Sequence, residues 1–208
     1  AEAAAEFRAA VALQPTDAAA AGNLGNLLRQ LGQTDEAVRV LSAAVQAAPA
    51  DPIVNDQYGR LLVEQGRVRD ALPHFAAAVA HAPDSAPLRN NLANALLQTG
   101  DADKARREYE AAVRLDPRHA DAHLNLGRLL LRSGEAAAAL PLLTRAVELN
   151  PGSLPGRGAL AQAQYETGDR GAGWQTLEAA IALAERRGDA AQRARLRALR
   201  EQWLRESP

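Results

Sequence analysis

The stretch NLGRLLLRSGEAAAALPLLTRAVELNP, residues 125–151, decides the fold, because its glycine and proline recur along the chain at one fixed step. The closing proline belongs to a series with intervals of 34 residues: Pro15, Pro49, Pro83, Pro117 and Pro151. The second glycine belongs to another series with the same step: Gly32, Gly66, Gly100, Gly134 and Gly168. Two series locked in one phase indicate a chain built from repeats.

Further columns of this register are filled by residue type as well as by spacing. Small side chains hold three of them: Ala37, Ala71, Ala105, Ala139 and Gly173; Ala44, Ala78, Ala112, Ala146 and Ala180; and Gly25, Gly59, Ala93, Gly127 and Ala161. Large apolar or aromatic side chains hold two: Leu41, Phe75, Tyr109, Leu143 and Leu177; and Leu24, Tyr58, Leu92, Leu126 and Leu160. We expect the small columns where two helices cross closely and the large ones between successive pairs.

A 34-residue period with Leu-Gly, then Ala, then an aromatic residue or Leu, then Pro resembles the tetratricopeptide repeat, a helix-turn-helix unit. The opening stretch carries this pattern as Asn125-Leu126-Gly127, Ala139 to Leu143 and Asn150-Pro151. The resemblance covers nearly the whole chain. It implies an all-α fold, a right-handed α-solenoid of helix-turn-helix units, in which one face of each first helix lines a concave groove where partners lie.

The register also predicts helix ends. Residues 18–31 carry leucines at helical spacing, and Gly32 ends that helix because glycine takes the left-handed turn at little steric cost. A second helix over residues 35–47 stops before Pro49, which cannot continue it. We therefore expect a half repeat consisting of a second helix only at 1–17, followed by five units at 18–51, 52–85, 86–119, 120–153 and 154–187.

The last unit and the end of the chain depart from the pattern. Glu185 stands where a proline is due, so the second helix of this unit is expected to run on towards Arg187. Residues 188–208 are predicted to form a C-terminal capping helix with Asp189 as its N-cap. Its apolar face would pack on the last repeat while its arginines meet water. An alternative for Arg193, Arg197, Arg200 and Arg205 is a site for an anionic partner.

Composition excludes several function classes. Without any cysteine, the chain has no disulfide framework, no thiolate metal site and no Cys nucleophile. A net charge of -1 argues against a nucleic-acid binder driven by global charge, and no apolar run is long enough for direct membrane insertion. We expect a soluble chain of the cytoplasm or the periplasm. Abundant alanine and arginine in place of lysine favour a bacterial source.

No set of residues in the sequence predicts catalysis, a metal site or a cofactor. His119 and His123 stand at i,i+4, a spacing that could place two imidazoles on one metal. However, His123 occupies a column that holds Ala21, Asn55, Arg89 and Arg157 in the other units. We interpret the two histidines as a surface pair and expect that the chain is not an enzyme.

Binding is what remains, and two polar columns favour it. They recur at the repeat spacing, and because they are three residues apart they share one helix face. The predicted peptide-binding residues in these columns are Asn23, Asn26, Gln57, Arg60, Asn91, Asn94, Asn125 and Arg128. An amide both donates and accepts, so such a row could bind the backbone of an extended peptide. The row is similar to the asparagine ladder of the repeat domain in O-linked N-acetylglucosamine transferases; equally, Asn is frequent in the first helix of this family.

The sequence therefore predicts a non-catalytic scaffold that binds an extended peptide or partner segment in its groove. The alternative is a regulatory or substrate-recruiting arm of a larger enzyme such as a glycosyltransferase, since the chain opens inside a helical pattern. A further partner is a second copy of the chain, because the half repeat is expected to expose apolar surface.

Overall fold

The computed structural model describes residues 2–14 and 17–206 of the chain. Over these ranges the chain consists of α-helices joined by short turns, with no strand among the described residues. The all-α class expected from the sequence is confirmed. Residues 1, 15 and 16 of the expected half repeat, Pro15 among them, lie outside the described residues, as do residues 207 and 208 of the expected capping helix.

By spatial contact the chain divides into two units, Ala1–Leu115 and Asp116–Pro208. The helices of the first unit are α1 (Glu2–Leu13), α2 (Ala18–Gln30), α3 (Thr34–Ala47), α4 (Pro52–Glu64), α5 (Val68–His81), α6 (Ala86–Gln98) and α7 (Ala102–Leu115). Those of the second unit are α8 (Ala120–Arg132), α9 (Ala136–Leu149), α10 (Leu154–Glu166), α11 (Arg170–Arg186) and α12 (Ala190–Glu206).

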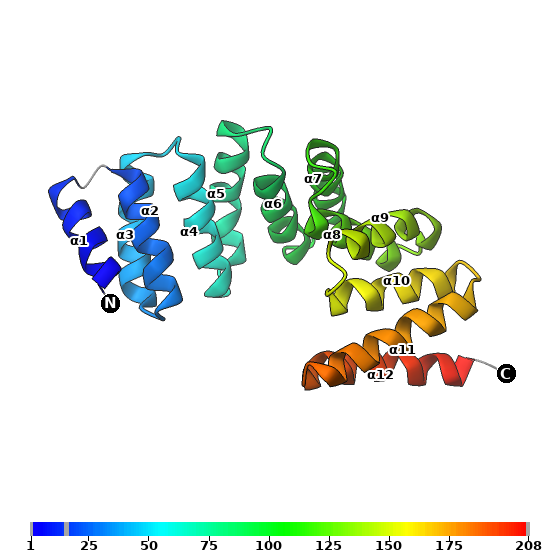
Figure 1. Ribbon diagram of the computed structural model, residues 1–208. Helices are drawn as coiled ribbons and strands as arrows, with labels where there is room; N and C mark the ends of the chain where they lie inside the picture. The colour runs from blue at the N-terminus through cyan, green and yellow to red at the C-terminus, as the bar shows by residue number, and fades with distance from the viewer. Residues whose placement is uncertain (1, 15–16, 207–208) are drawn as a thin grey trace. The chain divides into compact units, whose positions relative to one another are not determined.

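Within each unit, consecutive helices pack in pairs. The pairs are α2 with α3, α4 with α5 and α6 with α7 in the first unit, and α8 with α9 and α10 with α11 in the second (Figure 1). Each pair also packs on the next pair of its own unit, through α3 with α4, α5 with α6, and α9 with α10. Helix-turn-helix pairs stacked on their neighbours are the architecture of an α-helical repeat protein. The division into five units of 34 residues stays a proposal.

The glycine series forms the turns inside the pairs. Gly32, Gly66, Gly100, Gly134 and Gly168 all adopt positive φ, from 72° at Gly32 to 97° at Gly168. Because L side chains rarely adopt this conformation, glycine ends each first helix without strain. The left-handed turn expected at Gly32 is confirmed.

Close packing between the helices of a pair explains the small columns. Ala37, Ala71, Ala105 and Ala139 are fully buried. A Cβ atom added to Gly59 of α4 would lie 2.9 Å from Cε1 of Phe75 in α5, and one added to Gly127 of α8 would lie 2.6 Å from Cγ of Leu143 in α9. The large side chain of the second helix therefore occupies the space that a Cβ of the first helix would need.

At the end of the chain, α11 extends to Arg186, as expected from the missing proline. The next helix begins after Asp189, whose Oδ1 accepts a hydrogen bond from the backbone N–H of Gln192 at 3.0 Å. In α12, Leu196 and Trp203 are buried, and the Trp203 ring stacks on Tyr165 of α10 at 4.1 Å between centroids. One face of α12 thus closes the apolar core of the second unit.

Candidate functional site

In the first unit, the first helices of the three pairs are neighbours: α2 contacts α4, and α4 contacts α6. The predicted polar columns lie at equivalent positions on these helices. We call them together the amide face, which comprises Asn23 and Asn26 of α2, Gln57 and Arg60 of α4, and Asn91 and Asn94 of α6. None of these side chains is fully sealed in the core, since each of the six residues is exposed or half-buried. The face is therefore at least partly exposed to solvent.

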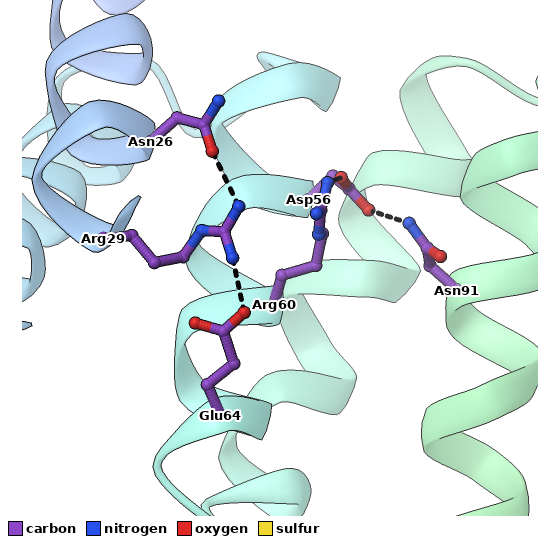
Figure 2. A network of polar contacts seen from close by, with 6 residues as sticks. All are labelled: Asn26, Arg29, Asp56, Arg60, Glu64 and Asn91. Atoms are coloured by element: carbon purple, nitrogen blue, oxygen red, sulfur yellow. Dashed lines mark hydrogen bonds and ion pairs between the residues drawn. The ribbon is translucent and has the colours of Figure 1, made fainter. Parts of the chain in front are cut away.

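A chain of polar contacts joins α2 to α4 (Figure 2). The guanidinium of Arg29 donates to Oδ1 of Asn26 at 2.8 Å and to Oε1 of Glu64 at 2.5 Å. The amide of Asn26 is therefore held in one orientation by a charged neighbour from its own helix. That neighbour is fixed in turn by the carboxylate of the next repeat.

A second set of contacts joins α4 to α6 through a buried carboxylate. Asn91 donates its Nδ2–H to Oδ1 of Asp56 at 2.7 Å, and Arg60 lies 3.9 Å from the other oxygen (Figure 2). Asp56 is 8% exposed. Burial raises the pKa of its carboxyl group, while the hydrogen bond from Asn91 and the charge of Arg60 oppose the rise. Asn91 and Arg60 are therefore positioned by the fold as well as presented to solvent.

The remaining amides differ in their surroundings. Asn94 accepts a hydrogen bond from the hydroxyl of Tyr109 in α7 at 2.5 Å. Gln57 lies against Gly22 of α2, with its Oε1 2.5 Å from the place where a Cβ of that glycine would be. Asn23 is exposed. The predicted row thus contains one amide bonded within the fold, Asn94, one packed against the neighbouring first helix, Gln57, and one exposed, Asn23.

Between α4 and α6 the amide face is hollowed by a cavity of about 240 Å³. Its polar lining comes from Arg60, Glu64, Asn91, Asn94 and Gln98. Its apolar lining comes from Val63, Phe75 and Ala95. An apolar surface with a few convergent polar groups is the usual composition of a recognition site.

In the second unit, α8 carries the two remaining predicted residues. Asn125 is half-buried and Arg128 is exposed. Arg128 lines a second cavity of about 330 Å³, bounded by α8, α10 and α12. Six of the eight predicted residues therefore lie in the first unit and two in the second.

Sequence reasoning missed Arg29, Asp56, Glu64 and Tyr109, which orient the predicted amides. The columns gave no signal for Asp56, because the equivalent positions hold Gly22, Asn90, Leu124 and Gly158. A search for polar pairs spaced by 35 residues, in place of 34, would have indicated two of these contacts. The pairs Arg29 with Glu64 and Asn91 with Asp56 are both 35 residues apart, one more than the repeat period. Position n of one first helix thus meets position n + 35 of the next.

The interpretation of His119 and His123 as a surface pair is wrong for His123. Its side chain is buried, with only 6% of the residue exposed, and Nε2 lies 3.1 Å from the carbonyl oxygen of Pro117. His119 caps α8, accepting a hydrogen bond from the backbone N–H of Ala122 at 3.3 Å. The two imidazoles therefore have separate structural partners. No group of three or more His, Asp or Glu side chains within residues 2–14 and 17–206 is arranged to hold a metal ion.

The arginines of α12 that formed the alternative anion site are mostly paired. Arg197 binds Glu185 at 2.6 Å, Arg200 lies 3.5 Å from Glu178, and Arg205 lies 3.9 Å from Glu201. In the described part of the chain, no helix combines the length and the apolar character needed to cross a membrane.

Two models of known protein families match the chain. One family model described as tetratricopeptide repeat matches residues 1–57 and 62–113, and another with the same description matches residues 90–153. Together with the paired helices, these matches place the chain among the α-helical repeat proteins. The chain belongs to the tetratricopeptide repeat family.

Solved structures of other proteins share the fold. YrrB, described as a TPR protein with an unusual peptide-binding site, is 19% identical, with 92% of this chain and 97% of that chain covered and a TM-score of 0.70. PilF of Pseudomonas aeruginosa is 19% identical over 92% of this chain and 93% of its own, with a TM-score of 0.71. MamA of Desulfovibrio magneticus, residues 41 to the end, is 25% identical over 72% and 85%, with a TM-score of 0.63. No curated protein matches the chain significantly.

Proposed function

We propose that this chain is a non-catalytic scaffold that binds an extended segment of a partner protein. The main contact surface is the amide face of α2, α4 and α6, and Asn125 and Arg128 of α8 form a corresponding surface in the second unit. Membership of a family built to present helix faces supports the proposal. So does the fold shared with YrrB, a protein described by its peptide-binding site.

The cavity between α4 and α6 is the observation that carries the proposal. Its apolar lining of Val63, Phe75 and Ala95 suits a partner side chain. The amides around it suit the backbone on either side of that side chain, because an amide offers two N–H donors and an acceptor oxygen. Recognition of this kind reads few side chains, so one surface can accept related segments.

The internal contacts of the amide face support binding too. Asn91 uses one donor on Asp56, and Asn26 accepts from Arg29, so each amide is held in a defined orientation before a partner arrives. Fixing a mobile side chain on binding costs about 0.5 to 1.5 kcal/mol of conformational entropy. A side chain that is already ordered loses less.

A selection of random peptides displayed on phage, carried out against the whole chain, tests the proposal. Selected peptides are then titrated against the double variant Arg60→Ala, Gln98→Ala, which removes two groups from the cavity rim. The matched control is Arg39→Ala, Gln46→Ala, which removes the same chemical groups from the exposed side of α3. We expect the peptides to bind Arg60→Ala, Gln98→Ala about tenfold more weakly, a loss of about 1.4 kcal/mol, and to bind the control as they bind the parent.

Melting temperatures of the two variants show whether either change perturbs folding. Equal affinities of both folded variants for every selected peptide, or a selection that yields no binding peptide, would remove the amide face as a binding site.

A further inference from the structure

The cavity of the second unit differs in chemistry from that of the first. It is bounded by Arg128 and Arg132 of α8, Gln162 of α10, and Gln192 and Arg195 of α12. Its apolar lining is formed by Leu131, Pro155, Ala159 and Leu199. Three arginines thus line a cavity of about 330 Å³, and none of the described residues that line it is acidic.

Within residues 2–14 and 17–206, these three arginines have no partner of opposite charge. Among the described residues, no ion pair or side-chain hydrogen bond engages Arg128, Arg132 or Arg195. The neighbouring arginines of α12 behave differently, since Arg197, Arg200 and Arg205 each lie within 4.0 Å of a glutamate oxygen. The positive charge around the cavity is therefore uncompensated, whereas that of the rest of the helix is largely balanced.

The lining indicates which anion fits. A guanidinium binds a carboxylate through two parallel hydrogen bonds, which favours acidic side chains or a chain terminus. Gln162 and Gln192 can bind a peptide backbone, and Leu131 with Leu199 offers apolar surface for a side chain next to the carboxylate. Binding of single-stranded nucleic acid relies on aromatic side chains for base stacking, and none of the described residues that line this cavity is aromatic.

We propose that the cavity between α8, α10 and α12 binds an acidic peptide segment that carries an apolar side chain beside its carboxylate. The inference rests on the proposed function in one respect, since Arg128 belongs to the surface assigned above to the second unit. It adds the chemical class of the partner. It also assigns Arg132, Gln162, Gln192 and Arg195 to recognition.

The experiment is a random-peptide selection run in parallel on three forms of the whole chain. They are the parent, the cavity variant Arg132→Gln, Arg195→Gln, and the control variant Arg118→Gln, Arg186→Gln. The control removes the same charge from exposed arginines of the same unit outside the cavity. Both changes affect solvent-exposed side chains, so unchanged melting temperatures are expected and are measured first.

Parent and control should enrich peptides with Asp or Glu next to Leu, Ile, Val or Phe, and the cavity variant should not. The best acidic peptide should bind the cavity variant at least about tenfold more weakly, as expected for a charged hydrogen-bonded pair. Replacing its acidic residues with Asn and Gln should cause a similar loss. The same peptide should bind the double variant Arg60→Ala, Gln98→Ala of the first unit as tightly as the parent.

Several results would overturn the inference. A selection on the parent that enriches no acidic peptide, or acidic peptides that bind the cavity variant as tightly as the parent, would do so. So would a 20-nucleotide single-stranded DNA that binds the parent, loses affinity in the cavity variant and displaces no peptide. If every selected peptide responds only to Arg60→Ala, Gln98→Ala, this inference is refuted and the proposed function of the amide face is left intact.

Discussion

Arg157 donates its Nε–H to the carbonyl oxygen of Pro151, 2.8 Å away and six residues earlier in the chain. The same link recurs in three preceding repeats, in both units. Its members are Asn55 with Pro49 at 2.9 Å, Arg89 with Pro83 at 2.7 Å and His123 with Pro117 at 3.1 Å. Three different side chains thus satisfy the carbonyl group of the proline turn, because each carries a nitrogen that reaches it. This shared bond explains how Asn, His and Arg, which have no common size or charge, occupy one column.

Substitutions at His123 test the link. We expect His123→Ala to lower the free energy of unfolding by about 1 to 3 kcal/mol, because the Pro117 carbonyl loses its partner and a buried space opens. His123→Asn should cost less, since Asn55 makes the equivalent bond in another repeat. Urea denaturation of the two variants checks the order. Equal losses would show that the bond contributes nothing.

The stability of the fold should also depend on pH through His123. Burial lowers the pKa of His123, as it does for His74, so the folded chain favours the neutral imidazoles. Their contribution to the free energy of unfolding is present above the unfolded pKa of about 6.5 and is lost as pH falls through the lower folded pKa values. His123→Asn removes one of the two. The variant should therefore lose less stability than the parent between pH 7 and pH 5, measured by urea denaturation.

At Asp56 the dependence of stability on pH should have the opposite sign. Burial raises the pKa of its carboxyl group, so its contribution is fully present below the unfolded pKa of about 3.9 and is lost as pH rises through the folded value. Asp56→Asn keeps an oxygen that can accept from Asn91 but no longer ionises. We expect this variant to gain stability relative to the parent as pH rises from 3.5 to 7. A difference that stays constant with pH would contradict the assignment.

Two glycine-to-alanine changes separate packing from helix propensity. In α8, Gly127→Ala places a Cβ atom 2.6 Å from Cγ of Leu143, and the resulting overpacking should lower stability by about 1 to 3 kcal/mol. In α11, Gly171→Ala meets nothing closer than Asp169 Oδ1 at 3.9 Å, so the alanine should raise stability by up to about 1 kcal/mol. Thermal melting of both variants measures the contrast, and a stabilising Gly127→Ala would refute the close approach.

The sequence by itself determined the repeat, its helices and its turns. Those features depend on local rules: Gly32 ends a helix by its left-handed conformation, Pro49 cannot continue one, and Ala71 fits where two helices cross closely. Each rule acts within one 34-residue period and repeats with it, so the pattern is visible as columns. The polar columns that define the amide face were visible for the same reason.

Only the tertiary structure decided how those polar residues are used. Asn91 is bonded to Asp56 and Asn26 to Arg29, while Arg29 reaches Glu64, and two of these contacts join residues 35 apart in the chain. Column reasoning compares equivalent positions, whereas neighbouring helices bring together positions that are not equivalent. The cavity between α8, α10 and α12 likewise depends on where α12 packs, beyond the last period of the sequence. Contacts between elements set these features, and no periodicity within one element encodes them.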